Sequence, residues 1–169
     1  MTELSHVGPD GAARMVDVSA KGETERFARA TGCIRMRSET LAAIRDNGLG
    51  KGDVLAVARI AGVMAAKRTA ELVPLAHPVP LTDVQVTFDL DESLPGVRTE
   101  CTARSVGRTG VEVEAIIAVS VTLVTIYDMV KGVDRGVVIS DIFLLEKGGG
   151  RSGHWTRGGN SRESNFDAR

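Results

Sequence analysis

The sequence predicts an α+β protein of the ferredoxin-like class, with an antiparallel β-sheet and helices packed on one face. Two observations lead to this class. Residues 24–36, 82–92, 97–106 and 136–146 have the length and the apolar or alternating pattern of strands. Helical segments separate the first strand from the second and the third from the fourth, so the order along the chain is that of a split βαβ motif.

The first half of the chain is expected to form one strand and two helices. Residues 24–36 alternate polar and apolar side chains over part of their length, as in a strand. Ser38 is placed to cap a short helix over residues 38–47, which an Asn-Gly pair ends. Asp53 is placed to cap a longer helix that runs through Val73 and stops at the proline that follows.

The second half is expected to supply three strands and one long helix. Residues 82–92 alternate cleanly, and residues 97–106 return after a turn. The apolar side chains on one face of the first of these strands are Val84, Val86, Phe88 and Leu90. An apolar helix is predicted from Val111 to Met129, and a last strand over residues 136–146.

A chain of 169 residues with 43% hydrophobic and 25% charged residues suits one compact domain. We assign residues 17–155 to that domain, between a flexible N-terminus (1–16) and a flexible polar tail (156–169).

Composition also excludes several classes of protein. A net charge of −1 argues against nucleic-acid binding, and no apolar run reaches the roughly 20 residues that span a bilayer. The N-terminus has no signal-peptide core, and Cys33 and Cys101 do not form a metal-type pair. These features predict a cytoplasmic protein with reduced thiols and no membrane partner.

Lysine is scarce, since it accounts for only five of the 21 basic residues. An ammonium group can shift its pKa and exchange protons where a guanidinium cannot, although solvated surface charge explains five lysines equally well. Lys51 lies between two glycines before a helix start, where anions bind readily. Lys147 begins KGGGRSG, a glycine-rich stretch that suits either a phosphate cradle or a flexible linker. Lys67 continues an apolar line on its helix, which favours a side chain that reaches out to water.

The long apolar helix carries carboxylates at both ends. Glu112 and Glu114 lie in its first turn, where the helix dipole already explains them. Asp128 lies in the last turn, where an acid is unfavourable without a partner, and Lys131 three residues on is the simplest partner. Glu114 and Asp128 are about 21 Å apart along the axis. If both act in one site, that site must be built between subunits.

His77 lies in the stretch LVPLAHPVPL. A lone histidine among apolar residues is usually packed and satisfied by one hydrogen bond. The flanking prolines fix the backbone and favour a ring presented from a rigid loop instead. His6 and His154 lie near the ends of the chain, so a three-histidine zinc site is not expected.

Four segments in this order, LAHPV, RTGVEVEA, IYDMVKGVDRG and LLEKGGGRSG, together with VDVSAKGETERFARATG near the start, resemble the cyclic pyranopterin monophosphate synthase family (molybdenum cofactor biosynthesis protein C). The similarity extends from about Met15 to Trp155. It implies a lyase that converts cyclised dihydro-GTP to cyclic pyranopterin monophosphate with release of diphosphate, and it makes the predicted domain the catalytic one. It also implies a homohexamer, a trimer of dimers, with sites at subunit interfaces.

The resemblance assigns roles to particular residues. It implies an acid/base role for Asp128, with Lys131, Lys51 and His77 as further catalytic groups. The substrate-binding residues that it implies are Leu75, Ala76, His77, Glu112, Val113, Glu114, Lys67, Lys147, Arg26 and Lys21. It implies no required cofactor, and it leaves open Mg²⁺ bound through the substrate phosphates.

The chain departs from the family pattern at a few positions, and two other functions compete. The family often has Cys, Met, Cys and Lys where this chain has Ala76, Val113, Val130 and Arg151. The acid/base set is intact, so we expect an active enzyme rather than a ferredoxin-like paralogue that binds a small ligand without turnover. An RNA-binding domain on the same topology is not favoured, because aromatic residues are 4% of the chain and Phe88 belongs to the expected core face.

Overall fold

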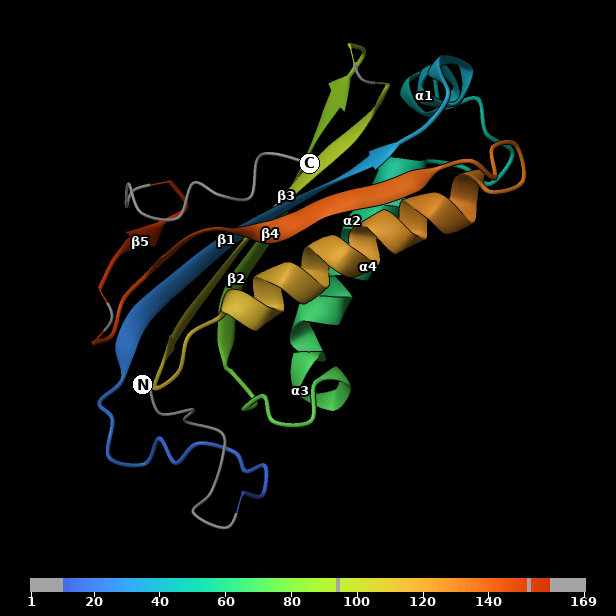
Figure 1. Ribbon diagram of the computed structural model, residues 1–169. Coiled ribbons are helices and arrows are strands. Elements are labelled where there is room, and N and C mark those ends of the chain that lie inside the picture. The colour runs from blue at the N-terminus through green and yellow to red at the C-terminus, as the bar shows by residue number, and fades with distance from the viewer. Residues whose placement is uncertain (1–10, 94, 152, 159–169) are drawn as a thin grey trace.

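The computed structural model describes residues 11–93, 95–151 and 153–158. Within them, an antiparallel sheet has the strand order β2-β3-β1-β4-β5 (Figure 1). The strands are β1 (Thr24–Arg35), β2 (Leu81–Asp91), β3 (Gly96–Gly107), β4 (Val138–Gly148) and β5 (Trp155–Thr156). The helices are α1 (Ser38–Arg45), α2 (Val54–Lys67), α3 (Thr69–Leu72) and α4 (Glu112–Val130). The predicted α+β, ferredoxin-like class is confirmed.

The central strand β1 shows why α4 lies so close to the sheet. Ala28, Ala30 and Ile34 are completely buried, whereas Arg29 and Arg35 on the opposite face are exposed. A Cβ on Gly32, in the same alternation, would lie 2.8 Å from Leu123 and 2.9 Å from Val119 of α4. Small residues on β1 therefore let the helix approach the sheet closely.

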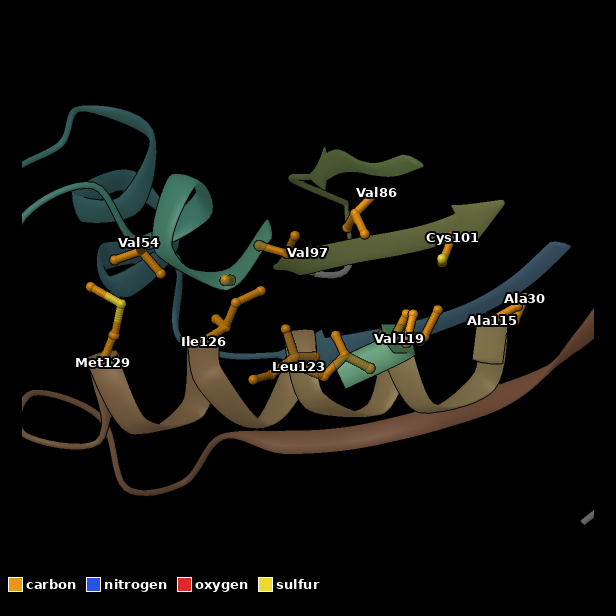
Figure 2. Close-up of a cluster of buried hydrophobic side chains, with 14 of the residues drawn as sticks. Ala30, Val54, Val86, Val97, Cys101, Ala115, Val119, Leu123, Ile126 and Met129 are labelled. Carbon is orange, nitrogen blue, oxygen red and sulfur yellow. The ribbon is translucent and has the colours of Figure 1, made fainter. Parts of the chain in front are cut away.

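The hydrophobic core lies between α4 and the sheet, as Figure 2 shows. Val119, Leu123 and Ile126 of α4 are fully buried there. By length and composition α4 could also cross a membrane, and it alone among the described helices could do so. Half of its apolar window is buried inside the protein, and α4 packs against α2 and against the four strands β1 to β4, as a core helix does.

The predicted helix boundaries are partly confirmed. Asp53 does cap α2, because its carboxylate accepts from the Ala56 N–H at 2.9 Å. Ser38 is not the cap of α1; Arg37 holds that position and makes no side-chain cap hydrogen bond. The helix expected to reach residue 73 breaks at Arg68, whose φ and ψ are −112° and 13°. The Thr69 hydroxyl donates to the Ala66 carbonyl at 3.0 Å, a local bond that competes with helix continuation.

The last predicted strand is displaced by two residues. Gly136 stays in the preceding turn, where its N–H donates to Asp134 at 3.1 Å, so β4 starts at Val138. At its far end β4 continues through Lys147, which pairs with Ala28 of β1 and with Trp155 of β5. The short strand β5 was not predicted. The flexible ends that we expected fall largely on residues 1–10 and 159–169, outside the described residues.

Gly62→Ala is expected to destabilise the fold by about 1–3 kcal/mol through overpacking. Gly62 lies where α2 crosses α4, and a Cβ there would collide with the Thr122 hydroxyl and lie 3.0 Å from the Ala118 carbonyl. Denaturant unfolding at fixed protein concentration measures the loss. Gly22→Ala is the matched control, because a Cβ at Gly22 meets nothing within 4 Å.

The Thr122 hydroxyl is buried without a hydrogen-bond partner, so Thr122→Ala alone should cost little. Combined with Gly62→Ala it removes the atom in collision and should restore part of the lost stability. Purely additive losses in the double variant would rule out this contact as the cause.

Candidate functional site

A cavity of about 500 Å³ opens at the N-terminal end of α4. Its walls are the proline-rich loop after α3, the loop before α4 and the first turn of α4. Six of the predicted site residues line it: Leu75, Ala76, His77, Glu112, Val113 and Glu114. Val73, Val79, Thr109 and Gly110 complete the lining; sequence reasoning did not propose these four as site residues.

The loop that carries His77 is short and internally bonded. The Ala76 N–H donates to the Val73 carbonyl at 3.0 Å. Hydrogen bonds from Ser19 lower the pKa of Asp17 most, and His77 adds a smaller electrostatic contribution in the same direction, which places the N-terminal segment near the loop. Asp17 is a group that sequence reasoning missed. No local pattern could reveal it, since only the path of the chain brings it towards His77.

Glu114 is a buried carboxyl at the edge of the cavity, with only 4% of its surface exposed. Burial raises its pKa, the Glu114 backbone N–H opposes that rise, and the charge of Glu112 adds to it. Removal from water disfavours the ionised form, so Glu114 keeps its proton to a higher pH than an exposed glutamate does. The helix dipole alone does not account for a carboxyl held in this way.

Glu112 connects the cavity to the glycine-rich segment after β4. Its Oε1 lies 2.8 Å from the Lys147 Nζ, and both side chains are about 30% exposed. Residues 35 positions apart in sequence are thus joined at the cavity wall. A ligand with negative charge can reach this ammonium from solvent.

Arg26 of β1 lies beside the same glycine segment. Its Nε donates to the Gly107 carbonyl at 2.9 Å, and its Nη2 donates to the Arg108 carbonyl at 3.3 Å. A Cβ on Gly150 would collide with the Arg26 guanidinium, and one on Gly149 with the Glu25 carbonyl. Close packing on β1, together with φ values of 98° and 68° at Gly149 and Gly150, therefore requires glycine here. This packing explains the glycines better than a flexible linker does.

Lys21 and Lys67, the other two predicted binding lysines, lie outside the lining of the first cavity. Lys21 is in an exposed turn next to Ser19, whose carbonyl accepts from Arg108 at 3.3 Å. Lys67 lines a neighbouring cavity of about 390 Å³, and Val79 lines both cavities. Lys67 therefore borders the first cavity without lining it.

Asp128, Lys131 and Lys51 form a separate cluster at the C-terminal end of α4. The Lys131 Nζ lies 2.6 Å from Oδ1 of Asp128, and the Lys51 Nζ lies 3.7 Å from its Oδ2. Lys51 also donates to the Asp128 carbonyl at 2.8 Å. All three side chains are about half exposed.

This cluster has a defined charge state. Lys131, and less strongly Lys51, lower the pKa of Asp128, and Asp128 raises the pKa of Lys131. At neutral pH the cluster therefore holds a carboxylate and an ammonium in contact. Neither Lys131 nor Lys51 is removed from water within the single chain, because both side chains are about half exposed.

Among the described residues, no group of three or more His, Cys, Asp or Glu side chains is arranged to hold a metal ion.

The similarity to known proteins extends over both the cavity and the Asp128 cluster. The sequence matches the MoaC family over residues 15–150. The chain belongs to the MoaC family. Proteins from Brucella ovis and Brucella melitensis, each named cyclic pyranopterin monophosphate synthase, are 56% identical to this MoaC family member over 153 residues, which is 90% of this chain and 93% of theirs. A protein of the same name from Brucella canis is 55% identical over the same shares. The resemblance noted in the sequence is confirmed.

Proposed function

We propose that this MoaC family member is a cyclic pyranopterin monophosphate synthase, a lyase of molybdenum cofactor biosynthesis. It converts cyclised dihydro-GTP (3′,8-cyclo-7,8-dihydroguanosine 5′-triphosphate) to cyclic pyranopterin monophosphate and releases diphosphate. One observation carries the proposal: the cavity at the start of α4 gathers His77, Glu112 and Glu114 in a chain 56% identical to relatives with this name.

The cavity suits the ring system of such a substrate, and its basic margin suits the phosphates. Leu75, Ala76 and Val113 offer apolar walls, and Glu112 and Glu114 offer polar groups that can orient ring nitrogens. A triphosphate carries about four negative charges, which ammonium and guanidinium groups hold by charge-assisted hydrogen bonds. Lys147, Arg26, Lys21 and Lys67 supply such groups from four segments of the chain.

Ring opening and rebuilding need repeated proton transfers, and the cluster at the other end of α4 can perform them. Asp128 is ionised and can accept a proton, whereas Lys131 is charged and can donate one. Lys51 holds a second ammonium against the same carboxylate and can stabilise developing negative charge. His77, in the cavity, is the fourth proposed catalytic group.

The cavity and the Asp128 cluster can serve one reaction only if two copies of the chain build the site. The last turn of α4 lies about 21 Å from its first turn, too far for one small substrate. Large apolar side chains are exposed on α2 (Val57, Ile60 and Met64) and on α4 (Val113 and Val124). Exposed apolar surface of this kind favours a protein partner. Two copies packed with antiparallel α4 helices would bring the Asp128 end of one against the cavity of the other.

We extend this proposal to a homohexamer, a trimer of dimers, in the cytoplasm. No resident cofactor is required; Mg²⁺ can arrive bound to the substrate phosphates. Nucleic acid is not a proposed partner, because the net charge is −1 and aromatic residues make up only 4% of the chain.

The wild-type protein is expected to turn over cyclised dihydro-GTP. The pterin product is read by fluorescence after oxidation, and diphosphate release is measured in parallel. A protein that binds the compound but forms no pterin, under conditions where a MoaC family enzyme of known activity does, would be a ligand-binding paralogue instead.

A further inference from the structure

Asp134 is a buried carboxylate in the loop after α4, and the proposed reaction gives it no direct task. Only 5% of the residue is exposed. Its Oδ2 accepts from the Arg37 backbone N–H at 2.9 Å and from the Thr40 hydroxyl at 3.1 Å. Its Oδ1 accepts from the Gly136 N–H at 3.1 Å. Two donors from the distant start of α1 and one from the loop itself thus converge on one carboxylate.

These partners keep the buried group ionised. The Arg37 N–H is the largest cause that lowers the pKa of Asp134; Thr40, Gly136 and the Arg37 guanidinium, 3.5 Å away, act in the same direction. The carboxylate also lies at the N-terminal end of α1, where the helix dipole favours negative charge. Arg37 donates in turn to the Val133 carbonyl, so the loop is bound to the start of α1 at two points.

This junction lies next to the ammonium groups that flank Asp128. The Lys131 N–H donates to the Tyr127 carbonyl and the Asp134 N–H to the Val130 carbonyl, both at 2.9 Å. Asp134 is therefore fixed one short turn after Lys131. In the other segment, the chain leads from the end of α1 through residues 46–50 to Lys51.

We propose that Asp134 is a positioning residue, which joins the loop after α4 to α1 and so holds Lys131 and Lys51 against Asp128. Each ammonium faces a different carboxylate oxygen of Asp128, and that geometry needs both segments in register. The inference rests on the proposed function, because it is this function that assigns proton transfer to the three groups.

The test compares Asp134→Ala and Asp134→Asn with Val86→Ala, a core variant on β2 that loses stability without touching the junction. Asp134→Ala is expected to lower kcat by about 10²-fold and to change KM by less than about threefold, because displacement of catalytic groups, not loss of substrate contacts, is the defect. Asp134→Asn keeps one acceptor oxygen and should lose only about tenfold. Val86→Ala, assayed well below its Tm, should keep kcat within about twofold.

A second readout separates positioning from stability and does not need turnover. Lys131 and Lys51 lower the pKa of Asp128, so their displacement should raise it towards its ordinary value, and ¹³C NMR titration of the carboxyl detects this. The acid limb of the kcat profile should move to higher pH in parallel in the Asp134 variants alone. If Asp134→Ala does not fold, Asp134→Asn carries the same comparisons.

An unchanged Asp128 titration, or losses of kcat equal to those of Val86→Ala, would overturn the proposal. A wild-type enzyme without turnover would refute the proposed function instead, while the Asp128 titration would still test whether Asp134 holds the cluster together.

Discussion

Replacement of Asp128 or Lys131 by alanine is expected to lower kcat for cyclised dihydro-GTP by about 10²–10⁴-fold, the range for loss of a general acid or base. Both side chains are about half exposed, so their removal should leave the fold and the Tm intact. Stopped and steady-state assays of pterin formation measure the loss, and circular dichroism verifies the fold. Binding of substrate to each folded variant, measured by calorimetry, should persist.

Two further variants make this experiment specific. Glu92→Ala is the matched control, because Glu92 forms an ion pair with Arg45 at 2.6 Å that is also exposed and shares no residue with the Asp128 cluster or the cavity. It should retain full activity. Lys131→Arg keeps the positive charge but cannot give up a proton. If Lys131→Arg is as active as the wild type, Lys131 acts through its charge and not as a proton donor.

The charge state of the Asp128 cluster also determines how activity depends on pH. The pKa of Asp128 is lowered by Lys131 and Lys51, so the carboxylate stays ionised below the ordinary range of an aspartate. If Asp128 acts as a base, activity should be present above that lowered pKa and disappear as the pH falls through it. In Lys131→Arg the charge is kept, and the acid limb of any residual activity should stay in place.

Two inactive variants are expected to restore activity when they assemble together. Co-expressed in equal amounts, His77→Ala and Asp128→Ala should form mixed dimers in which one site receives both intact groups. For random pairing in twofold dimers, about a quarter of all sites are then intact. Differently tagged chains allow the mixed species to be purified and assayed.

A second mixture serves as the control for subunit mixing and for folding of the variants. The double variant His77→Ala/Asp128→Ala is combined with an equal amount of wild type. About a quarter of the activity remains if each site spans two copies, and about half remains if each site lies within one chain. No restoration in the first mixture together with half activity in the second would refute the interface proposal.

Part of the candidate site could be predicted from short stretches of sequence. The proline-rich loop around His77 and the acidic first turn of α4 were both recognised from residue order, and they meet at one cavity. Their roles towards a substrate stay predictions. Short-range features such as a fixed loop and a helix start are visible in sequence, because neighbouring residues determine them.

Long-range polar partners were not predicted. Glu112 meets Lys147, and Asp134 meets Arg37 from almost a hundred positions away. No periodicity marks such pairs, since each depends on where two elements end after packing. The Ser38 cap was wrong for the same reason: the carboxylate near the start of α1 comes from the distant Asp134 and not from a local residue.

The fold class, the order of the four long strands along the chain and the burial of α4 could all be predicted from residue order, because the apolar pattern along each element dictates which face leaves water. Helix length alone also predicted that Glu114 and Asp128 cannot share a site within one chain. The tertiary structure alone decided which charges pair, that α2 stops at Arg68, and that β4 continues through Lys147 to meet β5. Those features depend on contacts between segments far apart in the chain. Such contacts stabilise the fold only after packing of the core has brought the segments together.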